Sequence, residues 1–403
     1  MFSSRVIDAP RSGSARTREA GATASAPAQR LVFIDNVRWA MIVLVLSMHA
    51  AVTYSPFGSW YYRERPPVGA LETLFFATYQ GLLQSFFMAL LFFVAGYFTP
   101  TSYDAKGPGG FMMGRLRRLG LPALFYVVAL GPMTQALAFD WRGRGLSGEL
   151  DRYFASGRFL SGTGPMWFCA ALLVFCAGYV VVRAASARVK PRQDADDRIS
   201  GVAGVALTVA AIALSTFVVR LWQPVGSSVL NMQLCYFPSY VVMFGLGVAA
   251  CRGRWLEQIG DRFAILTAGA CLGVALAMWL PLLLLGGALQ GRQADFAGGA
   301  HWQSAALSLW EALVCVGMSF GVLAVFRASF GRQRAFSKFM SDNAFAVYVI
   351  HPPILVALAL ALAPITVPPI AKFVLLWGAG LVVCFGLAAP LARHVPGLGA
   401  ILK

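Results

Sequence analysis

Long uninterrupted apolar segments are the feature that most constrains the fold of this chain. Ten of them lie along the 403 residues, at 31–54, 70–98, 119–140, 165–185, 200–220, 230–251, 264–286, 303–327, 342–363 and 370–392. Each is long enough to cross about 30 Å of hydrocarbon as an α-helix, which rises about 1.5 Å per residue. Only 12% of the residues are charged, whereas a soluble protein has about a quarter. The sequence therefore predicts an all-α integral membrane protein, a bundle of about ten transmembrane helices.

The distribution of positive charge predicts the orientation of the chain. The formal net charge is +16, but the Lys and Arg residues lie mainly in short segments between the apolar runs, which is typical of a membrane protein and not of a nucleic-acid-binding one. If the N-terminus is inside, 23 of these cations are cytoplasmic and 9 lie on the outer side. We therefore predict a multi-pass protein of the cell inner membrane with both termini in the cytoplasm.

Residues 1–30 differ from the rest of the chain, because they are rich in Arg, Ser and Ala and lack the apolar core of a secretory signal peptide. We interpret them as a disordered cytoplasmic tail that precedes one membrane domain at 31–396. The 7 cysteines form no CxxC pair and have no metal-ligand spacing with histidine. Disulfides and a metal site are therefore not predicted, and the cysteines are expected to pack as small apolar side chains.

The first apolar segment, FIDNVRWAMIVLVLSMHAAVTY at 33–54, carries three ionisable side chains. On a helix, Arg38 and His49 lie on one face, because the steps between them amount to three turns and about 20°. Asp35, three residues before Arg38, shares that face. Charged groups of a membrane helix face the bundle interior or a wet cavity. Two simpler readings remain open: Asp35 and Arg38 pair near the interface, and His49 is a packed core residue.

This segment resembles the N-terminal signature of the acyltransferase-3 family of membrane enzymes, DxxR followed by ten residues and a histidine, on Asp35, Arg38 and His49. Ala95 stands where that family usually has serine. The runs YSPFGSWYY and QSFFMALLFFVAGYF are most similar to the subgroup of succinyltransferases that act on periplasmic glucans. Further similarities follow in the order of the family: FFVAGYF at 92–98, RLRRLGLP at 115–122, MWF at 166–168 and NAFAVYVIHPPI at 343–354.

The resemblance implies an O-acyltransferase. It would move an acyl group of the acetyl or succinyl class from an acyl-CoA donor to a hydroxyl of an extracytoplasmic glycan or other cell-envelope acceptor, with no bound cofactor. A neutral imidazole can take the proton of an attacking hydroxyl, and we expect His49 to do so, while Asp35 fixes Arg38 toward the donor. The resemblance implies that Arg115 and Arg118 bind donor phosphates, whereas charge alone favours an ordinary positive-inside anchor.

Four further residues are candidates for the acceptor site or a pocket. His351 precedes two prolines that free backbone carbonyls, so it either lines the acceptor site or satisfies the loosened helix, with Tyr348 as a candidate hydroxyl partner. Trp167 is a candidate for the acyl path, and core packing is its default role. For Glu311, an intramembrane acid, a structural ion pair or hydrogen bond is the simpler expectation.

The alternative function is a multi-pass transporter or flippase of a cell-envelope metabolite, since buried Arg, His and Glu are typical of transporters too. Many secondary transporters are built from internal repeats, and the sequence shows no convincing repeat, direct or inverted. The enzyme is therefore the favoured interpretation.

Overall fold

The computed structural model describes residues 31–64, 66–140, 146–157, 159, 162–186 and 201–402. The predicted tail at 1–30 lies outside these residues. From Val32 onward the chain forms one compact unit. Its elements in chain order are α1 (Val32–Tyr54), α2 (Ala70–Arg115), η1 (Leu116–Gly120), α3 (Leu121–Phe125), η2 (Tyr126–Leu130), α4 (Gly131–Asp140), α5 (Leu146–Ala155), η4 (Gly164–Met166), α6 (Trp167–Ser186), α7 (Val202–Arg220), η6 (Leu234–Tyr236), α8 (Phe237–Arg252), α9 (Trp255–Gln258), α10 (Asp261–Leu285), η7 (Ala288–Gln290), α11 (Gln293–Ala297), α12 (Trp302–Ser329), α13 (Ala335–Leu362), α14 (Pro369–Leu381), η8 (Val382–Ala388), α15 (Ala389–His394) and α16 (Leu398–Ile401).

Within the described ranges, nine helical stretches are long and apolar enough to cross a membrane. The predicted all-α membrane bundle is thus confirmed, while the cytoplasmic placement of both termini stays a prediction. The second stretch, Ala70–Ala138, has 69 residues, more than three times the roughly 20 needed for one crossing. It joins the predicted segments 70–98 and 119–140 through a helical connection. The connection bends at Gly107, whose φ of 67° is followed by Pro108.

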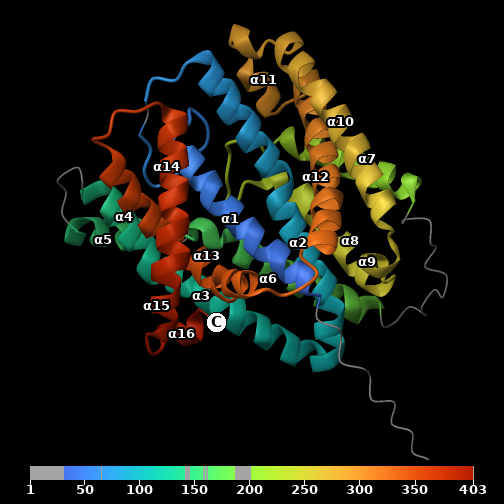
Figure 1. Ribbon diagram of the computed structural model, residues 1–403, viewed down its shortest axis with the longest axis horizontal. Helices are drawn as coiled ribbons and strands as arrows, with labels where there is room; N and C mark the ends of the chain where they lie inside the picture. The colour runs from blue at the N-terminus through green and yellow to red at the C-terminus, as the bar shows by residue number, and fades with distance from the viewer. Residues whose placement is uncertain are drawn as a thin grey trace, which may run out of the picture. The chain divides into compact units, whose positions relative to one another are not determined.

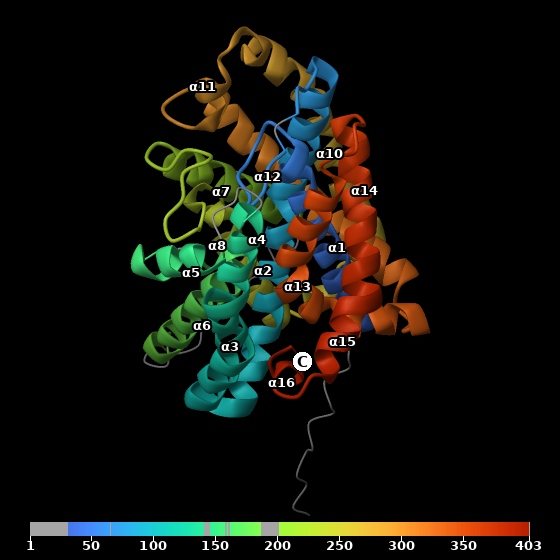
Figure 2. The ribbon, with the colours of Figure 1, turned by 90° about the vertical axis from the view of Figure 1, so that its left-hand side faces the viewer.

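Helix α1 lies in the middle of the unit and contacts α2, α12, α13 and α14, as Figure 1 shows. Its apolar side chains are buried on all sides, as in Ile34, Val37, Leu46 and Ala50. A helix of this kind belongs to the core of a bundle. Helix α13 lies between α1 and α4 (Figure 2). Polar side chains on α1 and α13 therefore meet protein rather than lipid.

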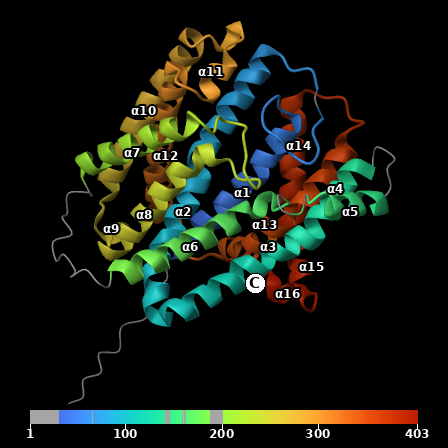
Figure 3. The ribbon, with the colours of Figure 1, turned by 180° about the vertical axis from the view of Figure 1, so that it is seen from behind.

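Helices α7 and α10 are placed differently, at the outer side of the unit (Figure 3). Each carries large apolar side chains that are exposed, among them Leu207 and Leu214 on α7 and Leu266 and Leu276 on α10. In a bilayer such faces contact lipid chains, which are as apolar as leucine itself. The bundle thus has an inner pair of helices, which can hold polar chemistry, and an outer set that seals it.

Two glycines allow α2 and α8 to pack closely: Gly96, in the run FFVAGYF of α2, and Gly247 on α8. A Cβ atom on Gly96 would come within 2.2 Å of the Phe244 carbonyl oxygen, and one on Gly247 within 2.1 Å of the Phe93 carbonyl oxygen. Only glycine permits this approach of α2 and α8, the packing typical of small residues in membrane helices. Gly96 is therefore required for packing. Phe98, two residues later, is held beside α1.

The chain between α1 and α2 folds back against the bundle. Within its described part, residues 55–64, the backbone N–H of Glu64 donates to the Thr53 carbonyl oxygen at 3.0 Å, and the Glu64 carboxylate pairs with Lys372 on α14. The Tyr61 hydroxyl lies 2.9 Å from that of Tyr126. Burial raises the pKa of Tyr61 to about 12, so its phenol stays neutral. These contacts fix the 55–64 segment over the end of α1.

Candidate active site

Asp35 and Arg38 form the ion pair that their spacing predicts. The Arg38 Nη1 atom lies 3.0 Å from the Asp35 Oδ1 atom. The guanidinium is 4.8 Å from the centre of the Phe98 ring, where a cation is stabilised by the aromatic face. The Arg38 side chain nevertheless remains 43% exposed. It is held at two points and still open to a ligand.

Arg115 and Arg118 lie at the same end of α1 as Arg38, close enough for their charges to act on its guanidinium. The Arg115 guanidinium is packed over Phe111 at 5.1 Å, and the Arg118 side chain is exposed. Like charges gathered in this way repel one another, so the cluster attracts anions. The structure thus brings the predicted donor-binding residues together with Arg38. Arg38 and His49, by contrast, are separated by about 16 Å of helix.

His49 contacts two other aromatic rings that come from distant parts of the chain. Trp60, in the 55–64 segment, stacks on it with ring centres 3.8 Å apart and planes 15° apart. His351, on α13, has its ring centre 5.2 Å away and its plane tilted by 16°. We call Trp60, His49 and His351 the histidine stack. His49 as a residue is partly exposed, whereas His351 is buried.

His351 is fully buried, and its two ring nitrogens differ. Nδ1 lies 2.8 Å from the Tyr348 carbonyl oxygen. Since a carbonyl only accepts, Nδ1 carries a proton, and in the neutral ring Nε2 is a bare acceptor. Nε2 has no hydrogen-bond partner among the described residues. The reading in which His351 satisfies the loosened helix therefore holds for Nδ1, while a role of His351 in the acceptor site stays a prediction.

Tyr348 does not place its hydroxyl on His351. The hydroxyl donates to the Pro165 carbonyl oxygen, which ties α13 to η4. Trp167, two residues beyond Pro165, packs with its ring centre 5.7 Å from Tyr240 and 6.2 Å from Phe237. This is the core packing that is the default for an aromatic residue. Trp167 is thus part of an aromatic cluster between α6 and α8.

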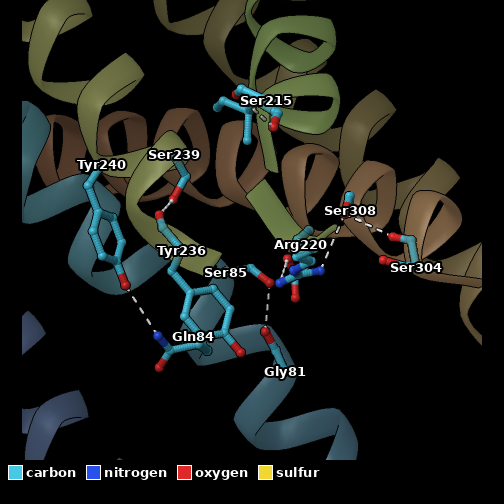
Figure 4. Close-up of polar contacts among 12 residues, drawn as sticks. Gly81, Gln84, Ser85, Ser215, Arg220, Tyr236, Ser239, Tyr240, Ser304 and Ser308 are labelled. Carbon is cyan, nitrogen blue, oxygen red and sulfur yellow. Dashed lines mark hydrogen bonds and ion pairs between the residues drawn. The ribbon is translucent and has the colours of Figure 1, made fainter. Parts of the chain in front are cut away.

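Glu311 forms the ion pair expected of an intramembrane acid. Its Oε2 atom lies 2.7 Å from Nη2 of Arg220, whose side chain is completely buried. The Arg220 Nη1 atom also donates to the Ser308 Oγ atom at 3.4 Å, and its guanidinium lies 5.4 Å from the Tyr236 ring. Figure 4 shows Arg220 next to Ser308, with Gln84 bonded to Tyr240 nearby. A small cavity adjoins the pair, lined by Gln84, Ser85, Ile212, Thr216, Tyr236, Ser239 and Glu311.

Sequence reasoning missed three residues of the site. Trp60 lies in a connection, where an aromatic residue reads as an anchor at the membrane interface. Its Nε1 atom is buried and has no partner in the described part of the chain. Lys372 and Glu64 hold the 55–64 segment in place. The sequence did offer one signal for the pair: Lys372 is a lone lysine near the start of an apolar segment, and a buried cation needs an acidic partner.

The arrangement can perform acid–base chemistry with a neutral imidazole, and it offers a cluster of guanidinium groups for an anion. In the ranges that the structure covers, no group of three or more His, Cys, Asp or Glu residues is placed to hold a metal ion.

A family model for an acyltransferase domain matches residues 31–392. No curated protein and no solved structure matches the chain. The matched range contains the predicted DxxR and histidine of α1 as well as Arg115, Arg118 and His351. It covers nearly the whole membrane domain. The chain therefore belongs to the acyltransferase-3 family of membrane acyltransferases.

Proposed function

We propose that the enzyme moves an acyl group of the acetyl or succinyl class from acyl-CoA to a hydroxyl of an extracytoplasmic glycan or another cell-envelope acceptor. It would act in the cell inner membrane with both termini in the cytoplasm, and acyl-CoA would be a substrate with no cofactor besides it. One observation carries the proposal. A single buried helix, α1, holds an open cation at one end and a partly exposed imidazole further along.

The cation cluster at Arg38 suits the donor. Coenzyme A carries several phosphate charges, which cannot enter hydrocarbon cheaply, and arginine pairs phosphate oxygens bidentately. Arg38, Arg115 and Arg118 supply three guanidinium groups against the one carboxylate of Asp35. The thioester arm would then extend along α1 for about 16 Å, the rise from Arg38 to His49. The acyl group would arrive at the histidine stack.

In this proposal His49 acts as the general base. The imidazole takes the proton of the acceptor hydroxyl while the hydroxyl oxygen attacks the thioester carbonyl carbon. A C–O bond forms, the C–S bond breaks, and the imidazolium returns the proton to the leaving thiolate. Products are an ester, a free thiol and neutral His49. A transient acyl-histidine is the other route through this residue. It predicts labelled protein when donor is supplied without acceptor.

The acceptor would approach from the other end of α1. The 55–64 segment covers that end and seats Trp60 on His49, while the ion pair of Glu64 with Lys372 keeps the segment in place. Donor and acceptor would thus reach His49 from opposite ends of one helix. This geometry suits transfer across a membrane, since neither substrate has to cross it.

The test is acyl transfer by the purified protein in vesicles with radiolabelled acyl-CoA as the donor. His49→Ala should lose about 10²–10⁴-fold in transfer rate, the usual contribution of a general base. Coenzyme A should still protect this variant against thermal unfolding, because a ligand of the folded state stabilises it. His394→Ala is the matched control, since this histidine is exposed and bonds only the Pro390 carbonyl oxygen. Transfer by His49→Ala at the wild-type rate would overturn the proposal.

The acceptor can be identified separately. Mass spectrometry of surface glycans from a deletion strain should show the loss of one acyl mass, and the size of that mass distinguishes acetyl from succinyl. An unchanged glycan profile, together with no protection by coenzyme A, would favour a transporter instead.

A further inference from the structure

The two histidines of the stack are the only buried or partly buried ones of the four in the chain, since His301 and His394 are exposed. His49 and His351 lie on α1 and α13, with their ring centres 5.2 Å apart. No described residue makes a hydrogen bond to the His49 ring, whereas His351 is bound at one nitrogen only. The His351 ring is thus oriented by a backbone carbonyl, whereas the His49 ring is oriented by no hydrogen bond from a described residue.

The bare Nε2 atom of His351 needs a partner. An unsatisfied buried polar group destabilises a folded protein and requires an explanation where it occurs. Because Nδ1 holds the proton against the Tyr348 carbonyl, Nε2 can only accept. Its partner must therefore be a donor. The Tyr348 hydroxyl is already engaged by Pro165.

His49 is the donor that the geometry favours. An N–H···N bond between two imidazoles joins nitrogens about 3 Å apart, which places the ring centres about 5 Å apart. The observed separation is 5.2 Å with planes only 16° apart. Because Trp60 stacks on His49 at 3.8 Å and its ring centre is 6.3 Å from His351, His351 lies beside the edge of the His49 ring and not over its face. The ring centre of Trp60, whose buried Nε1 atom also lacks a described partner, is further from His351 at 6.3 Å. The terminal torsion of a histidine is soft, so the His49 ring can rotate toward this nitrogen.

We propose that His351 is the positioning residue of His49: its Nε2 accepts the ring N–H of His49 and thereby fixes the tautomer that leaves the other His49 nitrogen bare. This inference rests on the proposed role of His49 as the base. A base histidine needs such an orienting partner, because the nitrogen that faces the reactant must be unprotonated. Hydrogen bonds of this kind often form only in the substrate complex. No carboxylate is required for the role, so a second imidazole serves.

The tautomer can be read directly by ¹⁵N NMR of histidine-labelled protein, since protonated and bare ring nitrogens give separate signals. In a His301→Gln/His394→Gln background only the two rings of the stack remain. We expect His49 in a single tautomer there, and in a mixture of two tautomers after His351→Phe. Trp60→Phe keeps an aromatic ring but removes the other N–H, and it should leave the His49 tautomer fixed. An unchanged His49 signal in His351→Phe, or a changed one in Trp60→Phe alone, would overturn the inference.

A kinetic test uses the conservative variant. His351→Phe should lower the rate of acyl transfer about 10–100-fold, the usual effect of removing an orienting partner, while donor affinity stays the same. His351→Gln places an amide oxygen near the position of Nε2 and should recover part of the rate. Equal, wild-type rates in both variants would refute the inference. If the wild type itself transfers no acyl group, the proposed function fails, and the NMR result alone decides the pairing.

Discussion

Two polar clusters inside the same apolar bundle differ in how completely their groups are paired. Arg220 and Glu311, on α7 and α12, are charged and bind each other at 2.7 Å, with Ser308 as a further acceptor. In the histidine stack the groups are neutral and incompletely bonded. The Nε2 atom of His351 and the Nε1 atom of Trp60 are both buried without a partner among the described residues. One cluster is closed, and the other is left open.

The difference follows from the cost of burial. An unpaired charge in an apolar interior costs several kcal/mol, so Arg220 and Glu311 must pair in the resting protein. A neutral ring nitrogen costs only about 1–3 kcal/mol, which a bundle can tolerate. A substrate can form hydrogen bonds only with groups that are not already bonded within the protein. Complete pairing is thus what we expect of polar groups that join helices, and incomplete pairing agrees with the role proposed for His49 and His351.

The largest loss of stability is expected when the ion pair of Arg220 with Glu311 is broken. Arg220→Met leaves Glu311 as an uncompensated acid and should lower the free energy of unfolding by about 3–5 kcal/mol. Replacing both residues, as Arg220→Met/Glu311→Leu, should recover most of this loss, because no charge is left buried. Unfolding of the detergent-solubilised protein measures both values. A loss below about 1 kcal/mol in the single variant would show that the pair is not a structural tie.

A smaller effect is expected where an ion pair supports the open cluster. Lys372→Met removes the partner of Glu64 and should cost about 1–3 kcal/mol, since Glu64 is partly exposed. The rate of acyl transfer should fall as well, because the 55–64 segment is no longer fixed and Trp60 no longer stacks on His49. Lys338→Met is the matched control. Its pair with Asp342 is exposed, so both stability and transfer should be nearly unchanged. Equal effects of the two lysine variants would contradict this role for Glu64.

The cation cluster should contribute to binding rather than to stability. Arg115→Ala/Arg118→Ala should weaken donor affinity by about tenfold, because charge-assisted hydrogen bonds to phosphate are lost. Wild-type affinity should fall with rising salt, and this dependence should be weaker in the variant. Arg117→Ala is the control, since Arg117 lies in the same run but, unlike Arg115 and Arg118, is not among the charges that act on Arg38. If Arg117→Ala weakens binding as much, the run acts only as a general positive anchor.

The smallest effect distinguishes the two clusters most directly. His351→Phe should change the free energy of unfolding by less than about 1 kcal/mol in either direction. The variant loses one bond to the Tyr348 carbonyl and also removes a nitrogen that had no partner. A loss of several kcal/mol, as expected for Arg220→Met, would mean that the stack is also a closed structural cluster.

Much of this architecture could be predicted from local pattern. The apolar segments became helices because a backbone in hydrocarbon must satisfy its own hydrogen bonds. The Asp35–Arg38 pair followed from a spacing of three on one helix. The helical connection between the second and third segments was not predicted: it is broken at Gly107, which has φ 67° and ψ 171°, and is helical on both sides. Glycine and proline show where a chain can bend and not how far.

The chain by itself determined the class of protein, the helices and the residues that carry charge into the membrane, because hydrophobicity and helical period act over neighbouring residues. The tertiary structure alone decided which of those residues meet. His351 reaches His49, Arg220 reaches Glu311 and Lys372 reaches Glu64, each across a long stretch of sequence. Such pairs depend on how helices pack. Packing is set by shape complementarity over many side chains, as at Gly96 and Gly247, which no local pattern encodes.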